Sequence, residues 1–84
     1  MILLAEDNLL NQRISMRLLQ KLGYAVRVAA DGDQALREVE KESFAAILMD
    51  CQMPEMDGFE ATRLIRAREA ATGRHIPIIA ITAF

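Results

Sequence analysis

The heptapeptide FAAILMD, residues 44–50, is an unbroken apolar run that ends at Asp50. A short apolar run between polar residues is typical of a strand that is buried on both faces of a parallel sheet. Residues 1–5 and residues 76–81 form two further runs of this kind. Residues 24–29 alternate between apolar and polar side chains, which is typical of a half-exposed edge strand. The sequence therefore predicts four strands.

Three segments between these strands carry apolar residues at the spacing of an amphipathic helix. The first begins after Asn8, a predicted N-cap, and Gly23 lies where a glycine would end it. Residues 31–34 (DGDQ) and 57–60 (DGFE) have the pattern of a capping box, and Gly73 ends the last helix. The apolar positions in the three segments are Leu10, Ile14, Leu18, Leu19, Leu22, Ala35, Leu36, Val39, Ala61, Leu64 and Ile65.

Strands and helices thus alternate along the whole chain. This order predicts an α/β fold, a doubly wound parallel sheet whose crossovers are right-handed. No linker, internal repeat or low-complexity tract interrupts the 84 residues. We therefore expect a single domain over residues 1–84.

Composition excludes several classes of protein. A net charge of −2 is unlike the basic balance of a general nucleic-acid-binding protein. No apolar run approaches the roughly 20 residues that span a bilayer, so we expect no membrane contact by this segment. The single cysteine, Cys51, cannot form an internal disulfide and fits a reducing compartment, so we expect a cytoplasmic location.

Acidic residues end two of the predicted buried strands. Glu6 and Asp7 follow the first, Asp50 ends the third, and Thr82 and Ala83 follow the fourth. Ligands of open parallel sheets bind at the carboxyl ends of the strands, where these side chains would converge if the first and third strands are neighbours. A cluster of carboxylate oxygens suits Mg²⁺ and would raise its members' pKa values without a cation. Solvated turns and helix caps remain the competing interpretation of each acidic residue alone.

Three ordered motifs of this sequence resemble a response-regulator receiver domain. They are residues 3–8 (LLAEDN), residues 48–58 (LMDCQMPEMDG) and residues 79–83 (IAITA), so the resemblance covers the whole chain. The subtype is also visible: residues 11–12 (NQ) and 50–54 (DCQMP) are similar to receivers of hybrid sensor histidine kinases. The resemblance implies a flavodoxin-like sheet and a role in a two-component phosphorelay.

The same resemblance implies roles for particular residues. Asp50 would be the phosphoacceptor, taking a phosphoryl group from a histidine kinase or a histidine phosphotransfer domain. Mg²⁺ would be bound by Asp7, by Glu6 directly or through water, by one oxygen of Asp50, and by the backbone carbonyl of Gln52. Phosphoryl oxygens would accept hydrogen bonds from the switch residue Thr82 and from the Ala83 N–H. A receiver of this kind is a phosphoacceptor rather than a free-standing enzyme, although the parent chain can be a membrane-anchored kinase.

The family pattern continues beyond the fourth strand with a helix, a fifth strand that carries a lysine, and a final helix. Phe84 is the last residue here, so we expect a receiver domain that is incomplete at its C-terminus. Residues 76–81 would then form an apolar edge strand, and such edges pair with other chains. From this we predict self-association through that edge or through a swapped element.

Two alternatives remain open. A degenerate receiver could act as a protein-interaction module without phosphorylation. A Mg²⁺-dependent phosphohydrolase with an aspartyl-phosphate is the enzymatic alternative, although such enzymes usually carry a second acid two residues after the nucleophile, where this chain has Gln52.

Overall fold

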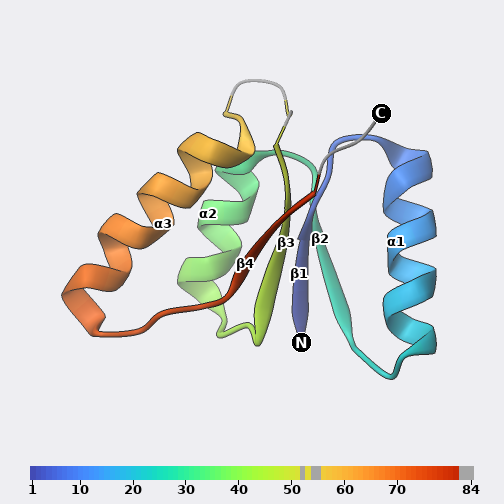
Figure 1. The fold of residues 1–84 in the computed structure, drawn as a ribbon, viewed down its shortest axis with the longest axis horizontal. Helices are drawn as coiled ribbons and strands as arrows, with labels where there is room; N and C mark the ends of the chain where they lie inside the picture. The colour runs from blue at the N-terminus through green and yellow to red at the C-terminus, as the bar shows by residue number, and fades with distance from the viewer. Residues whose placement is uncertain (52, 54–55, 82–84) are drawn as a thin grey trace.

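A computed structural model of the chain describes residues 1–51, 53 and 56–81. Helices and strands alternate in it as the apolar pattern predicts (Figure 1). The elements are β1 (Ile2–Ala5), α1 (Leu9–Lys21), β2 (Val26–Ala29), α2 (Gly32–Lys41), β3 (Ala46–Asp50), α3 (Gly58–Thr72) and β4 (Ile78–Ile81).

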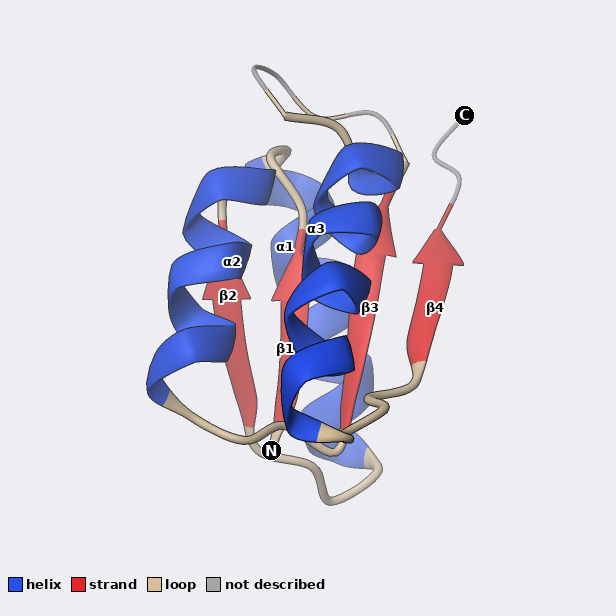
Figure 2. Ribbon diagram, turned by 90° about the vertical axis from the view of Figure 1, so that its left-hand side faces the viewer, coloured by secondary structure: helices blue, strands red, loops and turns tan. Residues whose placement is uncertain are grey.

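The four strands form one parallel sheet in the order β2-β1-β3-β4. All of them point the same way, so their carboxyl ends share one edge of the sheet (Figure 2). α1 covers one face, and α2 and α3 cover the other (Figure 1). This is the doubly wound, flavodoxin-like arrangement, and it confirms both the predicted fold class and the neighbouring positions of β1 and β3.

Each helix begins at the predicted cap. The side-chain oxygens of Asn8, Asp31 and Asp57 accept hydrogen bonds from backbone N–H groups three residues on, at 3.0, 2.8 and 2.9 Å. The reciprocal half of the predicted capping boxes is absent among the described hydrogen bonds. Instead, Gln34 accepts from the Ala30 N–H, just before the cap, and the Glu60 carboxylate pairs with Arg63.

The strands are shorter than the apolar runs that predict them, because some apolar residues anchor the chain before the strand begins. Phe44 lies in the core two residues before β3. Ile76 precedes β4 by two residues and is held by side chains of α3. Pro77 has no N–H, and its carbonyl accepts a hydrogen bond from Ile47 directly before β4 begins.

The hydrophobic core lies between the sheet and the α2–α3 layer. Its buried members are Leu3, Ala5, Ala29, Ala35, Leu36, Phe44, Ile47, Met49, Met53, Ala61 and Ile65. On the other face, α1 has the predicted amphipathic pattern, but none of its residues is buried. Leu10, Ile14 and Leu18 are all more than half exposed. Within the described ranges, no helix has both the length and the hydropathy that crossing a bilayer requires.

Candidate functional site

Three carboxylates meet at the carboxyl ends of β1 and β3. The pairing of these strands aligns Ala5 with Met49, so that Glu6 and Asp50 follow at the same level of the sheet. One oxygen from each of Glu6, Asp7 and Asp50 can be chosen so that all lie within 4.8 Å of one another. The predicted convergence of the three acids is therefore confirmed.

The backbone of Asp50 is held by its neighbours on two sides. A Cβ on Gly58, the first residue of α3, would lie 2.2 Å from the Asp50 carbonyl oxygen, so only glycine fits there without displacement. The next residue, Cys51, donates its N–H to the carbonyl of Ile81 in β4 at 3.1 Å. Gly58 at the start of α3 and Ile81 at the end of β4 thus fix the backbone from which the Asp50 carboxylate extends.

Hydrogen bonds hold both the backbone and the carboxylate of Glu6. Its N–H donates to the Ala29 carbonyl at 2.9 Å, and its carbonyl accepts from the side-chain amide of Gln12 at 2.6 Å. Its carboxylate accepts from the Asn8 N–H at 3.3 Å. Sequence reasoning used Gln12 only as a mark of subtype. The available signal for a structural role was the position of Gln12, whose amide side chain lies one helical turn after the Asn8 cap and can reach the acids.

The environment of Glu6 makes negative charge on its side chain costly. Glu6 and Asp50 are each only 3% exposed, whereas Asp7 is exposed. Burial, followed by hydrogen bonding to the Asp50 side chain, raises the pKa of Glu6 from 4.5 to about 7, although the Asn8 N–H opposes the shift. A divalent cation would offset the repulsion between the Glu6 and Asp50 carboxylates. Because the donors are carboxylate oxygens that bring negative charge and leave room for water, the residues present fit Mg²⁺.

Part of the predicted site lies outside the described residues. Gln52, Thr82 and Ala83 are among the positions on which the structure is silent, and so are Pro54 and Phe84. The roles that the resemblance gives Gln52, Thr82 and Ala83 therefore stay predictions.

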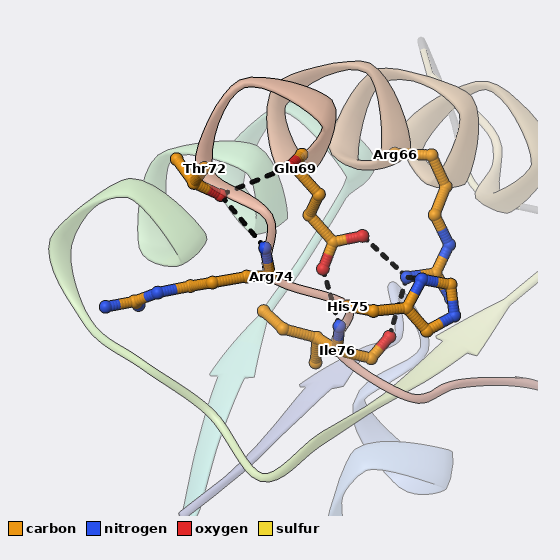
Figure 3. A network of polar contacts seen from close by, with 6 residues as sticks. All are labelled: Arg66, Glu69, Thr72, Arg74, His75 and Ile76. Atoms are coloured by element: carbon orange, nitrogen blue, oxygen red, sulfur yellow. Dashed lines mark hydrogen bonds and ion pairs between the residues drawn. The ribbon is translucent and has the colours of Figure 1, made fainter.

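A second polar cluster, which the sequence analysis did not anticipate, lies at the C-terminal end of α3 (Figure 3). Buried Glu69 accepts from the Ile76 N–H at 2.5 Å and from Arg66 at 2.6 Å, and Arg66 also donates to the Ile76 carbonyl at 2.8 Å. Burial alone would raise the pKa of Glu69, but the Ile76 N–H and the Arg66 guanidinium hold it below its usual value. We call Arg66, Glu69 and Ile76 the α3–β4 clamp. It fixes the start of β4, at the opposite end of the sheet from the carboxylates that follow β1 and end β3.

Comparison with known proteins identifies the family. The profile of the response regulator receiver domain matches residues 2–84. Among curated proteins, hybrid signal transduction histidine kinase I of Dictyostelium discoideum is 49% identical over 98% of this chain. The chain spans only 5% of the length of that relative.

Solved receiver structures have the same fold. The receiver of a Pseudomonas aeruginosa PAO1 sensor histidine kinase, with magnesium coordinated in its active-site cleft, is 54% identical with a TM-score of 0.90 over 98% of this chain and 66% of that chain. The receiver of an Arabidopsis thaliana histidine kinase, complexed with Mg²⁺ and BeF₃⁻, is 37% identical with a TM-score of 0.89 over 99% of this chain and 65% of that chain.

A third solved structure contains a partner. It is the complex of the Saccharomyces cerevisiae histidine phosphotransfer protein Ypd1 with the receiver domain of the response regulator Ssk1. Similarity to it is 31% identity, with a TM-score of 0.84 over 96% of this chain and 60% of that chain. Fold, sequence motifs and acidic cluster agree with the profile match, and the chain belongs to the response regulator receiver domain family of two-component signalling.

Proposed function

We propose that this chain is a phosphoacceptor, and that Asp50 receives a phosphoryl group from a phosphohistidine with the help of Mg²⁺. The observation that carries the proposal is the convergence of Glu6, Asp7 and Asp50 at one end of the sheet. Receivers with magnesium, or with Mg²⁺ and BeF₃⁻, are among the solved structures of similar sequence.

The chemistry follows from the position of Asp50. One of its carboxylate oxygens attacks the phosphorus in line with the departing imidazole nitrogen. The new O–P bond forms as the P–N bond breaks, and the electron pair of that bond stays on the imidazole, which takes up a proton. A carboxylate is a weak nucleophile, but phosphoryl transfer depends mainly on positioning and charge stabilisation.

The remaining residues position groups and compensate charge. Asp7 and Glu6, with one oxygen of Asp50, would hold Mg²⁺, which supplies positive charge to the phosphoryl oxygens when bound. For Gln52 we propose a backbone carbonyl ligand to the ion. For Thr82 and Ala83 we propose hydroxyl and N–H donors to the phosphoryl group, on the strength of the family resemblance.

The proposed partner is a histidine kinase or a histidine phosphotransfer domain. Support comes from the hybrid histidine kinases among the relatives and from the Ypd1 complex of a similar receiver. Because this chain spans only 5% of the length of such a kinase, the kinase activity of a parent protein is part of the proposal, as is a cytoplasmic location.

A small phosphodonor tests the proposal without a partner protein. Incubation with acetyl phosphate and Mg²⁺, followed by intact-mass measurement, should show one added phosphoryl group. Asp50→Asn should abolish the addition, whereas Asp33→Asn, at an exposed acid of α2, should leave it unchanged. Equal modification of the Asp50→Asn variant, or modification without Mg²⁺, would contradict the assignment.

The interaction-module alternative makes a different prediction. Among the described residues, the convergence of Glu6, Asp7 and Asp50 favours phosphorylation over this alternative. A chain that neither binds Mg²⁺ nor accepts phosphate would favour it. The phosphohydrolase alternative requires turnover, and catalytic release of phosphate from a phosphomonoester would favour it.

A further inference from the structure

We infer that Gln12 is a positioning residue for the metal site, because its side-chain amide holds the peptide that joins Glu6 to Asp7. The inference rests on the proposed function and adds a residue to it. Its basis is the 2.6 Å hydrogen bond from Nε2 of Gln12 to the backbone carbonyl of Glu6.

That carbonyl lies where the sheet can no longer provide a partner. The residue pairing of β1 with β2 and with β3 ends at Ala5. The N–H of Glu6 still donates to the Ala29 carbonyl, whereas its own carbonyl accepts from a side chain, that of Gln12. Glu6 is 3% exposed, and a buried carbonyl without a donor is costly. Gln12 supplies that donor.

The side chain of Gln12 extends from the first turn of α1, which is held by hydrogen bonds. Asn8 caps α1 through its side chain, and its carbonyl accepts the first hydrogen bond of the helix from the Gln12 N–H at 2.9 Å. The backbone of Gln12 therefore lies in a helical turn that is hydrogen-bonded to Asn8, the residue at which the loop after β1 ends. Its side chain then reaches back over the loop to the end of β1.

This contact bears on metal binding because Glu6 and Asp7 are adjacent in sequence. The peptide plane between them sets the directions of both side chains, and rotation of that plane would move the two carboxylates relative to Asp50. Mg²⁺ requires near-ideal octahedral geometry, so small displacements of its ligands reduce affinity. Residues that orient metal ligands typically change metal affinity by about 10–100-fold when they are mutated.

The competing explanation is that Gln12 only stabilises the fold. A Mg²⁺ titration of the complete 84-residue chain, followed through the backbone amide signals of Asp7 and Cys51, separates the two. Gln12→Met keeps the length of the side chain and removes the donor, and it should raise the Kd for Mg²⁺ by about tenfold. Gln20→Met, at an exposed position of the same helix, should leave the Kd unchanged.

Two further measurements cover the case in which Gln12→Met fails to fold. Gln12→Asn keeps the amide but shortens the side chain, so it should weaken Mg²⁺ binding while the helix remains capped by Asn8. In the wild-type chain, the Gln12 side-chain NH₂ signals should be shifted by the hydrogen bond and should move again when Mg²⁺ binds, whereas those of Gln20 should not.

The outcomes decide between the inference and the proposed function. A folded Gln12 variant with the wild-type Kd, or Gln12 amide signals that do not respond to Mg²⁺, overturns the inference and leaves the function intact. If the wild-type chain itself binds no Mg²⁺, the proposed function fails, and the inference fails with it.

Discussion

At the scale of single residues, Glu6 has the clearest electrostatic signature of the site. It lies 3% exposed beside Asp50 with its pKa raised to about 7. At neutral pH, a large share of the metal-free molecules therefore carries a proton on Glu6. Cation binding must displace that proton.

The first prediction concerns the pH dependence of stability. Because the folded chain binds the Glu6 proton more tightly than the unfolded chain, this residue contributes stability that is fully present below pH 4.5 and is lost as the pH rises through about 7. Measured in urea without metal, the free energy of unfolding of the wild-type chain should fall relative to that of Glu6→Gln across this window, because the lowered pKa of Glu69 acts in the opposite sense near pH 4.5 in both proteins. Excess Mg²⁺ should reverse the fall at neutral pH.

Glu6→Gln should remove this part of the pH dependence, and Asp33→Asn should keep it. A difference in unfolding free energy between the wild-type chain and Glu6→Gln that stays constant between pH 4.5 and 7 without metal would contradict the account.

Gly58 carries a second prediction at this scale, because its missing side chain leaves room for the backbone of Asp50. In Gly58→Ala the new Cβ would meet the Asp50 carbonyl oxygen, which lies 2.2 Å from the position of that atom. Overpacking of this kind typically costs about 1–3 kcal/mol, and here it also displaces the phosphoacceptor. Acetyl phosphate labelling should therefore be slower in the folded variant.

Gly32→Ala is the matched control for strain. Its Cβ would lie 2.6 Å from the carbonyl oxygen of Met56, and the three atoms nearest to it all belong to Met56 rather than to Asp50. It should lose stability in thermal unfolding but label faster than Gly58→Ala. Equal labelling of Gly58→Ala and the wild type would show that Asp50 tolerates the displacement.

At the scale of elements, the α3–β4 clamp determines where β4 begins. Glu69 and Arg66 bind both the N–H and the carbonyl of Ile76, so the backbone of the connection is fixed before the strand starts. β4 then pairs with β3 in a register that places Ile81 beside Asp50. The clamp thus acts on the site only through the position of a strand.

Glu69→Gln should therefore destabilise the chain. The neutral amide would accept hydrogen bonds more weakly than the carboxylate does. Its NH₂ group would also face a donor, either the Ile76 N–H or Arg66. We expect a loss of about 1–3 kcal/mol in chemical denaturation, the usual cost of leaving buried donors without an acceptor. Glu60→Gln should cost less than about 0.5 kcal/mol, because its pair with Arg63 is exposed. Similar losses in the two variants would contradict a structural role for the clamp.

The helices and strands also show how much of the structure can be predicted from the sequence alone. Apolar periodicity and the caps at Asn8, Asp31 and Asp57 predicted the order of the seven elements that the structure describes, because these signals are local. The acids were predicted to converge, since the topology of a parallel sheet brings strand ends together. Gln12 and Glu69 were not predicted as contacts, because their partners are backbone groups whose positions depend on tertiary packing.

At the scale of the whole molecule, the sheet has exposed apolar surface at its β4 side. β4 is an outer strand of the described sheet, and Ile79 is 53% exposed. α1 also leaves apolar residues exposed, among them Ile14 at 52%. An uncharged edge strand is a template for pairing with another chain. We therefore propose that this chain self-associates through the edge from Ile76 to Ile81.

Analytical ultracentrifugation at micromolar concentration should then show a dimer or a larger species. Ile79→Lys should restore the monomer, because a lysine on an edge strand opposes pairing. Ile14→Lys is the matched control on α1 and should leave the association intact. A wild-type chain that sediments only as a monomer would refute the edge proposal, and dissociation by Ile14→Lys alone would assign the contact to α1.

The central claim is that Asp50 accepts a phosphoryl group from a phosphohistidine. Its most direct test is transfer from a radiolabelled histidine phosphotransfer domain to this chain in the presence of Mg²⁺. The account predicts that label appears on the wild-type chain as it leaves the donor, and that Asp50→Asn receives none while Asp33→Asn still does. Label on the Asp50→Asn variant, or no transfer to the wild-type chain from any phosphohistidine donor that phosphorylates other receivers, would contradict it.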